Sequence, residues 1–329
     1  MQDYRIRIVE PHEIEYLWDL FSPSNINVNY TRSFHNWAKH YYNEFGSCKD
    51  ISRIITYNNQ IIGFWPLFEI VQNGIHSITY YANRIYEPII VEEFRVQVES
   101  SLSSLFEQII LIGRQDPLFE IQIQTYGIFR IFENYLEKNF SSRQVQLSFC
   151  DLSLELEQIW QSTRKSYKAL IHREEKVISV SFDDCTNFVS IDDYMKLHIS
   201  ASGRTVRSIE NWKIQGQAIS NGEAILCNLR DLNGKLVGGS YCNVSGKLAI
   251  YSSGAYDRSL EEEGRALGHL AQWAIIKYLK NNLGVKKYLL DVGNSSKIQS
   301  EKELSILHFK KGFARQSQEC KIYSLNSYG

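Results

Sequence analysis

The sequence has few cysteines, and their spacing excludes two kinds of scaffold. Its 329 residues include six cysteines, scattered from Cys48 to Cys320, and none of them forms a C-x-x-C pair. No two cysteines stand at zinc-finger spacing with histidines, which excludes a zinc-stapled fold. Scattered cysteines in a chain of this length suit a reducing compartment better than a disulfide framework.

Long apolar runs and a secretory signal are also missing. No stretch approaches the roughly 20 consecutive apolar residues that a membrane-spanning helix needs. The N-terminus lacks a basic region followed by an apolar stretch, so it does not resemble a secretory signal. We therefore expect a soluble, cytoplasmic protein without a membrane span, which meets any lipid-linked substrate by peripheral contact with a membrane surface.

An excess of charge of one sign is missing as well. The chain has 36 basic and 37 acidic residues, a net charge of −1. No global field then draws it to nucleic acid or to an anionic membrane, and we expect no DNA partner. A local basic groove stays open. The stretch from Arg164 to Arg173 either tracks RNA phosphates or forms a solvated helix face, and the second reading is favoured because Glu174 and Glu175 follow at once.

The signatures of several enzyme classes are absent. The sequence holds no H-E-x-x-H zinc motif, no P-loop and no G-x-S-x-G elbow. His198, His269 and His308 have no carboxylate or cysteine at ligand spacing, so we expect no metal, and His269 is predicted to be packed. No cysteine or serine is placed with a base, which argues against a covalent enzyme intermediate.

Periodicity predicts an α/β fold class in two halves. Strand-like and helix-like segments alternate along the whole chain, which indicates mixed β-sheets flanked by helices. The length also favours two domains. We place an N-terminal half at residues 1–152 and a C-terminal half, which carries the chemistry, at residues 153–329.

The two halves contain a similar succession of turns and strands. Residues 59–63 lead into a strand predicted over residues 60–71, and the turn Asn73-Gly74 precedes a strand over residues 75–82. Residues 233–238 lead into a strand over residues 235–244, and the turn Ser245-Gly246 precedes a strand over residues 248–256. This arrangement favours duplication of one supersecondary unit, although any β-meander gives a similar pattern.

The C-terminal half has a recognisable order of elements. A helix over residues 156–174 precedes a strand, two further helices and a three-strand meander. We then expect a long helix over residues 264–283, a strand over residues 286–292, a helix over residues 300–311 and a last strand over residues 321–325.

This order, together with Leu236-Val237-Gly238-Gly239 in the meander, resembles the GNAT acyltransferase fold. Two such halves in one chain resemble the FemABX family of peptidoglycan-bridge aminoacyltransferases. The strongest match is Phe309-Lys310-Lys311-Gly312-Phe313, which is similar to the F-K-x-G-F segment closing the last helix in that family. The resemblance implies attack by an amine on an activated acyl carbonyl, with acyl-CoA or aminoacyl-tRNA as co-substrate and no tightly bound cofactor.

The resemblance implies catalytic roles for Lys310 and Asp291. A lysine in the matching segment stabilises the negative charge that grows on the carbonyl oxygen, and Phe309 would shape the channel beside it. Asp291, at the predicted end of a strand, would take a proton from the amine. The alternatives are a solvated helix-end lysine and an aspartate that forms an Asx-turn before Gly293.

The start of the long helix is a candidate cofactor site. GNAT enzymes that use CoA carry an R/Q-x-x-G-x-G/A turn whose backbone N–H groups bind pyrophosphate, and Arg265-x-x-Gly268 fits it. Leu270 replaces the last small residue, and residues 261–263 are all glutamates, which weakens the CoA hypothesis. Ordinary helix chemistry is the alternative, because acidic residues favour a first turn.

Two further groups are predicted to bind substrate. Arg204 and Arg207, in a loop before Trp212, are predicted to bind substrate together with Trp212. The two arginines can form a fork for a phosphate or carboxylate, or are surface residues beside a helix end. Tyr251, Ser253 and Tyr256 surround Gly254, a glycine whose place in a strand suggests a bulge or a close approach to a ligand. A plain strand end is the alternative.

The function expected from these features is transfer of an acyl or aminoacyl group to an amine of a cell-envelope or surface-polysaccharide precursor. Its partners would be a nucleotide- or lipid-linked sugar or peptide acceptor, with tRNA as a further candidate. Two alternatives stay open: a CoA-dependent N-acetyltransferase acting on an amino sugar, and a non-catalytic binding module that kept the fold.

Overall fold

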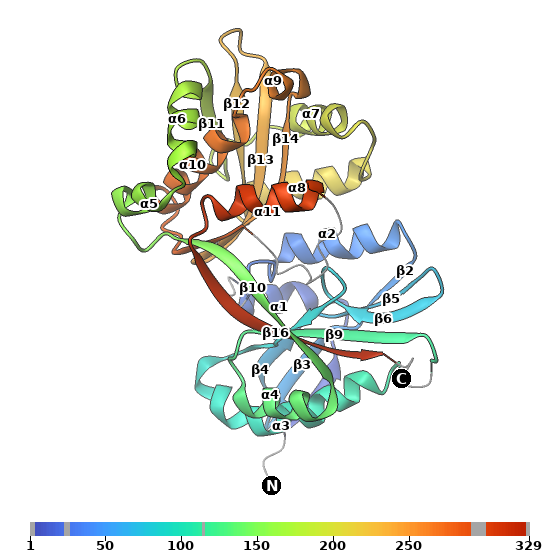
Figure 1. Cartoon of the computed structure of the whole chain (residues 1–329). Coiled ribbons are helices and arrows are strands. Elements are labelled where there is room, and N and C mark those ends of the chain that lie inside the picture. The colour runs from blue at the N-terminus through green and yellow to red at the C-terminus, as the bar shows by residue number, and fades with distance from the viewer. Residues whose placement is uncertain (1–3, 23–26, 114–115, 291–300, 327–329) are drawn as a thin grey trace. The chain divides into compact units, whose positions relative to one another are not determined.

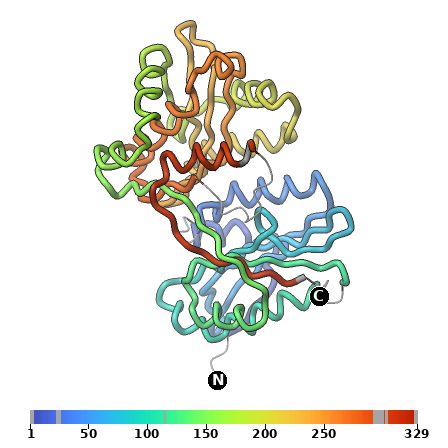
Figure 2. The backbone as a smooth tube through the Cα atoms, viewed as in Figure 1, coloured from blue at the N-terminus to red at the C-terminus, as the bar shows by residue number. Residues whose placement is uncertain are grey.

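The computed structural model describes residues 4–22, 27–113, 116–290 and 301–326 (Figure 1). The chain forms two compact units. Unit 1 comprises Met1–Val145 and Glu319–Gly329, and unit 2 comprises Gln146–Gln318. The chain passes from unit 1 into unit 2 along β10 (Ser141–Asp151) and returns along β16 (Gln316–Asn326), as Figure 2 traces.

This division differs from the boundary that the sequence suggested at residue 152. The final residues, placed by the sequence in the C-terminal half, belong to unit 1. The reason is strand pairing: β16 runs antiparallel to β9 (Phe119–Thr125) from Lys321↔Thr125 to Asn326↔Glu120. A pairing between segments so far apart in the chain leaves no local trace in the sequence.

Unit 1 is a mixed α/β unit with two groups of strands. One sheet has the order β1-β3-β4-β8, and the other strands follow the order β16-β9-β6-β5-β2, with β7 also paired to β9. Its remaining elements are β1 (Tyr4–Ile8), α1 (Ile14–Phe21), α2 (Arg32–Asn43), β2 (Ser47–Asp50), β3 (Arg53–Tyr57), β4 (Gln60–Trp65), β5 (Phe68–Gln72), β6 (Ile75–Thr79), β7 (Ile85–Tyr86), β8 (Ile89–Ile90), η1 (Glu92–Phe94), α3 (Arg95–Ile110) and α4 (Arg130–Asn139).

Unit 2 is built on the strand order β11-β12-β13-β14-β15-β10. Its other elements are α5 (Leu156–Ser162), α6 (Lys165–Glu174), β11 (Ser179–Asp183), α7 (Asp192–Ser202), α8 (Ile209–Ser220), β12 (Ala224–Arg230), β13 (Leu236–Ser245), β14 (Leu248–Tyr256), α9 (Arg258–Glu262), α10 (Leu267–Asn281), β15 (Lys287–Leu289) and α11 (Glu301–Lys311). The predicted α/β class with mixed sheets and flanking helices is confirmed.

Three predicted elements need correction. Residues 60–71 form two strands in different sheets, because Pro66 has no N–H to donate and separates β4 from β5. Residues 156–174 form two helices, because Arg164 leaves the helical conformation and donates its backbone N–H to Gly312 O at 2.9 Å. The long helix begins at Leu267 rather than at residue 264, because Gly264 has a φ of +80°.

The echo between the halves extends to an irregularity of the strands. In unit 1 the register of β3 and β4 shifts so that Ile62 is an extra residue just before Gly63. In unit 2 the register of β12 and β13 shifts so that Val237 is an extra residue just before Gly238. A β-bulge at the same place in both meanders agrees with two halves built on one plan.

The core of unit 2 holds the long helix against the sheet. α10 buries Leu270, Ile275, Ile276 and Leu279 completely or almost completely. Each such side chain contributes roughly 1.5–3 kcal/mol relative to an exposed one. This burial fixes the position at which α10 begins, and the candidate site lies there.

No helix within the described ranges combines the length and the apolar character needed to cross a bilayer.

Candidate active site

β14 and β15 are parallel neighbours in unit 2, and the pairing between them is short. β14 pairs with β15 at three positions, of which the last is Ile250↔Leu289. On its other edge β14 stays paired with β13 as far as Gly238↔Tyr256. Within the described residues, which stop at residue 290 and resume at residue 301, no strand pairs with this edge of β14 from Tyr251 onward.

A bulge lies at the same point of β14. Tyr241 pairs with Ser253 and Cys242 pairs with Tyr251, which leaves Ser252 as the extra residue. Bulges re-aim neighbouring side chains. The bulge predicted near Gly254 is therefore present slightly earlier in the strand. At Gly254 itself a Cβ would overlap the hydroxyl of Tyr251, so the glycine leaves room for that side chain, and the predicted approach of a ligand stays a prediction.

A cavity of about 750 Å³ opens at this edge. Its wall is formed by α6, β14, the segment leading into α10, and α11. This volume falls within the range of roughly 300–1,000 Å³ that is usual for small-molecule sites. Seven of the residues selected from the sequence line it: Tyr251, Ser253, Tyr256, Arg265, Gly268, Phe309 and Lys310.

Lys310 is in the last turn of α11 and lines this cavity. Its Nζ lies 5.9 Å from the centre of the Tyr251 ring, within the range of a cation–π contact. Burial raises the pKa of Tyr251 to about 12, so its phenol is neutral at physiological pH. The ammonium group therefore stands beside the first residue of β14 that follows the last β15 pair.

The segment Phe309–Phe313 packs against α6 and α10. The Phe309 ring lies 5.0 Å from the His269 ring and 5.7 Å from the Phe313 ring. Gly312 has no room for a side chain, because a Cβ there would overlap the Tyr167 ring. The glycine of the F-K-x-G-F segment thus lets Tyr167 pack behind Phe309 and fixes the position of Lys310.

His269 is part of this aromatic packing. Its ring meets the Tyr167 ring edge-on at 4.3 Å. Burial, helped by the charges of Arg164 and Arg173, lowers its pKa to about 4, so the imidazole is neutral near pH 7. A packed, neutral histidine agrees with the structural role that the sequence favoured.

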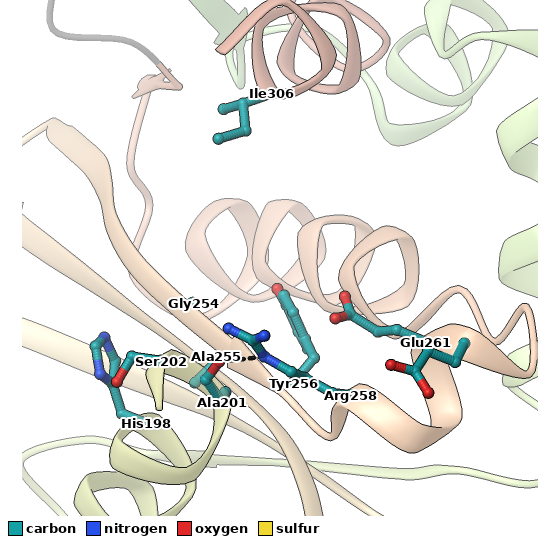
Figure 3. A pocket seen from close by; sticks show the side chains of 10 residues that line it. His198, Ala201, Ser202, Gly254, Ala255, Tyr256, Arg258, Glu261 and Ile306 are labelled. Atoms are coloured by element: carbon teal, nitrogen blue, oxygen red, sulfur yellow. Dashed lines mark hydrogen bonds between the residues drawn. The ribbon is translucent and has the colours of Figure 1, made fainter. Parts of the chain in front are cut away.

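A second cavity, of about 670 Å³, adjoins the first (Figure 3). The two share Gly254, Tyr256, Glu261 and Ile306 in their walls. Figure 3 shows Ile306 of α11 across the cavity from Tyr256 and Glu261. Arg258 donates a hydrogen bond from Nε to the backbone oxygen of Ala201, which ties the base of α9 to α7.

Glu261 is the carboxylate common to both cavities. Burial raises its pKa, and the nearby charge of Arg258 opposes that rise. A carboxylate with a raised pKa can accept a proton from a group bound in either cavity. The sequence marked Glu261 only as one of three consecutive glutamates that count against CoA.

Three predicted substrate-binding residues do not line either cavity. Arg204 is exposed in the turn after α7. Arg207 stacks 4.4 Å from the centre of the Trp212 ring and donates to Gln215 Oε1 at 2.7 Å. Trp212 is itself only 1% exposed. Arg207 and Trp212 are therefore part of the packing of α8. Asp291 lies outside the described residues.

Tyr194 is a residue that sequence reasoning missed. It is buried on α7, and its hydroxyl hydrogen-bonds Ser253 Oγ at 3.0 Å. It also meets the Trp212 ring edge-on at 5.8 Å. These contacts connect the packing of α7 and α8 to the cavity wall. The partners stand 59 residues apart in the chain, so no local pattern could signal the contact.

In the ranges that the structure describes, no three histidine, cysteine, aspartate or glutamate side chains come together to hold a metal ion.

Comparison with known proteins places the fold. The sequence matches no profile of a known protein family and no curated protein. Among solved structures, FemX is similar with a TM-score of 0.67 and 13% identity, over 98% of each chain. The C-terminal domain of a lysylphosphatidylglycerol synthetase from Agrobacterium fabrum is similar with a TM-score of 0.60 and 11% identity, over 96% of this chain and 92% of that one.

A third similar structure is a tandem GNAT protein from the clavulanic acid biosynthesis pathway. Its TM-score is 0.53 at 10% identity, over 99% of both chains. All three similarities extend over nearly the whole chain. The protein therefore shares the two-domain fold of FemX and of this tandem GNAT protein, which is the fold that the sequence resemblance implied.

Proposed function

We propose that this protein is an acyl- or aminoacyltransferase that acts on the amine of a cell-envelope or surface-polysaccharide precursor. The observation that carries the proposal is the cavity beside the last residues of β14, with Lys310 in its wall. A ligand there would lie between the last residues of β14 and the cation of Lys310. Similarity to FemX and to a lysylphosphatidylglycerol synthetase domain supports a transferase on this fold.

The chemistry is direct transfer in a ternary complex. The acceptor amine attacks the donor carbonyl carbon, a C–N bond forms, and the bond from the carbonyl to the donor's ester or thioester atom breaks. Negative charge grows on the carbonyl oxygen during attack. The ammonium of Lys310 stabilises that charge, an effect typically worth about 10²–10³ in kcat.

The amine loses a proton in the same reaction. Asp291 is the proton acceptor proposed from the sequence. Glu261 is the second candidate, because it lines both cavities and burial raises its pKa. In this proposal the donor carbonyl occupies the larger cavity and the acceptor amine reaches it from the smaller one.

The smaller cavity has a lining suited to a polar acceptor. Glu261 and Glu262 attract an ammonium group, and Arg258 offers a cation for a phosphate or carboxylate of the same acceptor. Arg204 does not line this cavity, but it is exposed two residues after Ser202, which does, and it stays a candidate for binding the anionic part of a nucleotide- or lipid-linked sugar.

A second candidate function is N-acetylation of an amino sugar with acetyl-CoA. The spacing of Arg265 and Gly268 in the sequence favours it, and both residues line the larger cavity. A non-catalytic binding module is the third possibility, and it predicts binding without turnover.

The test is a transfer assay that needs no prior choice of donor. The purified chain is incubated with acetyl-CoA or with a mixture of charged tRNAs, each with amino sugars and peptidoglycan precursor peptides, and products are identified by mass spectrometry. We expect a new amide on one acceptor class, absent from a parallel reaction with Lys310→Ala. Ligands that raise the melting temperature without any amide product would favour the binding module.

A further inference from the structure

The segment that leads into α10 is held by a buried carboxylate. Glu174, the last residue of α6, has no solvent-exposed surface. Its Oε2 accepts from Arg265 Nε at 2.7 Å, and its Oε1 accepts from the backbone N–H of Ala266 at 3.1 Å. Ala266 is the residue that caps α10.

Arg173 strengthens the same arrangement. Its Nε donates to Glu174 Oε1 at 3.0 Å, and its guanidinium donates to the backbone oxygen of Gly264 at 2.6 Å. Two arginines and one backbone N–H therefore converge on the Glu174 carboxylate. Burial alone would raise the pKa of Glu174, but these hydrogen bonds outweigh it and the net pKa is lowered. The carboxylate is ionised at neutral pH.

This contact is made where an external anion would otherwise bind. The start of a helix attracts phosphates, because unsatisfied backbone N–H groups and the positive end of the helix dipole meet there. Residues 264–268 line the larger cavity, so a diphosphate in that cavity would approach them. It would find Arg265 and the Ala266 N–H already bound to Glu174, and the carboxylate of Glu261 in the same wall.

Displacing Glu174 is unfavourable. A diphosphate that recruited Arg265 would leave a fully buried carboxylate with fewer partners, and a buried charge is stable only while it is paired and hydrogen-bonded. The residues at this point therefore do not fit the pyrophosphate of CoA, even though the spacing from Arg265 to Gly268 matches the sequence pattern of CoA-binding turns.

We propose that Glu174 is a specificity-determining residue, an internal anion that binds Arg265 and the start of α10 and so excludes donors held there by a diphosphate. The inference rests on the proposed acyl transfer, since only a transferase has a donor to select. It identifies the donor as one that is bound without a diphosphate at the start of α10.

The experiment measures anion binding without turnover. Wild type, Glu174→Gln and Glu175→Gln are titrated with inorganic pyrophosphate and with CoA, and binding is followed by thermal shift and calorimetry. Glu175 is the matched control, because it pairs with His172 and Lys277 on the surface. We expect at least a tenfold gain in affinity for both ligands in Glu174→Gln, none in Glu175→Gln, and loss of the gain when Arg265→Ala is added.

Two results would overturn the proposal. One is wild type that binds pyrophosphate as tightly as Glu174→Gln does. The other is a folded Glu174→Gln variant with no gain in affinity. If that variant does not fold, Glu174→Asp replaces it. The shorter carboxylate draws back from Ala266, so it should give a smaller gain, and a folded Glu174→Asp without any gain would also refute the idea.

These readouts separate this inference from the proposed function. A gain of pyrophosphate binding in Glu174→Gln, with no amide product from any donor, supports the role of Glu174 and counts against the transferase. Efficient turnover of acetyl-CoA by wild type, with an affinity for CoA that falls in Arg265→Ala, supports the transferase and counts against the role of Glu174.

Discussion

The two units share a strand order, β16-β9-β6-β5 in unit 1 and β10-β15-β14-β13 in unit 2, but they use it differently. In unit 2, the described pairing of β14 with β15 ends at Ile250↔Leu289, and a cavity lies beside the next residues of β14. In unit 1, the corresponding strands β6 and β9 pair in parallel up to Ile78↔Ile121. The next positions of β9 are taken by the short strand β7, with Ile85↔Ile123 and Tyr86↔Gln124.

The residues around β7 show how unit 1 fills this space. Tyr80, Ile85 and Tyr86 are almost fully buried, and Arg84 donates to Gln124 at 3.0 Å. A buried glutamate, Glu87, accepts from the backbone N–H of Tyr126 at 2.9 Å. In unit 1 the segment after the meander folds back as the strand β7 and becomes part of the core. In unit 2 the corresponding segment forms α9, and a cavity lies beside β14.

The largest difference between the two units is expected when the cation in the wall of the larger cavity, Lys310, is removed. Lys310→Ala should lower kcat by about 10²–10³, because the carbonyl oxygen loses its charged partner. Lys138→Ala is the matched control, since Lys138 is in the last turn of α4, the helix of unit 1 that corresponds to α11. It should leave turnover unchanged.

The measurement is steady-state kinetics with the donor and acceptor that the transfer assay identifies, alongside a melting curve for each variant. Turnover retained in Lys310→Ala, with a native melting temperature, would remove this lysine from the mechanism. Equal losses in both variants would show that the two units do not differ in the way described.

A second prediction concerns the carboxylate between the two cavities. Glu261→Gln should lower kcat/KM by about 10², because an amide cannot take the proton from the amine. In wild type, activity should fall as the pH drops through the raised pKa of Glu261, since the protonated carboxyl is no longer a base. That acidic limb should disappear in the variant.

Glu263→Gln is the control, because Glu263 follows α9 and lines neither of the two cavities. It should keep both the rate and the acidic limb. An unaltered pH profile in Glu261→Gln would leave Asp291 as the proton acceptor.

The third prediction compares the buried glutamates of the two units. Burial raises the pKa of Glu87 from 4.5 to about 7, whereas the arginines around Glu174 keep its pKa low. Between pH 4.5 and about pH 7, Glu87 keeps its proton in the folded protein and loses it in the unfolded chain, so the stability of unit 1 falls as pH rises. From pH 4.5 to pH 6, wild type should lose about 2 kcal/mol relative to Glu87→Gln, at 1.36 kcal/mol per pKa unit.

Urea unfolding of both proteins at the two pH values measures this difference. For Glu174 the sign is the opposite: relative to Glu174→Gln, wild type should gain stability as pH rises. A carboxylate with a lowered pKa stabilises the fold above its unfolded pKa and loses this effect in acid. Parallel pH profiles for wild type and Glu87→Gln would contradict the assignment.

Local patterns predicted much of the fold of unit 2. The meander, with β14 placed at residues 248–256, and the helix that ends in Phe309-Lys310-Lys311-Gly312-Phe313 follow from strand alternation, glycine turns and helical spacing. Tyr251, Ser253, Tyr256, Phe309 and Lys310 were selected because these elements were located correctly, and they line one cavity.

Contacts between distant segments were out of reach. Arg207 and Trp212 looked like a binding loop, but the Arg207 guanidinium stacks on Trp212 and bonds Gln215. Glu174 looked like the end of a charged helix face, but it is buried against Arg265, 91 residues later. A pattern in sequence shows which residues share an element, not which other element will cover them.

The smallest expected effect tests how far the two units share one plan. α2 of unit 1 and α8 of unit 2 both begin with a side-chain cap: Thr31 Oγ1 accepts from Phe34 N at 3.3 Å, and Ser208 Oγ accepts from Asn211 N at 3.2 Å. Thr31→Ala and Ser208→Ala should each cost about 1 kcal/mol, while Thr31→Ser and Ser208→Thr should restore most of it. Hydrogen exchange resolved by peptide should locate each loss in its own unit, because each cap stabilises a helix in one core. Equal loss of protection in both units from either variant would mean that they unfold as one block, and the open and closed halves would then share their stability despite their different use of the fold.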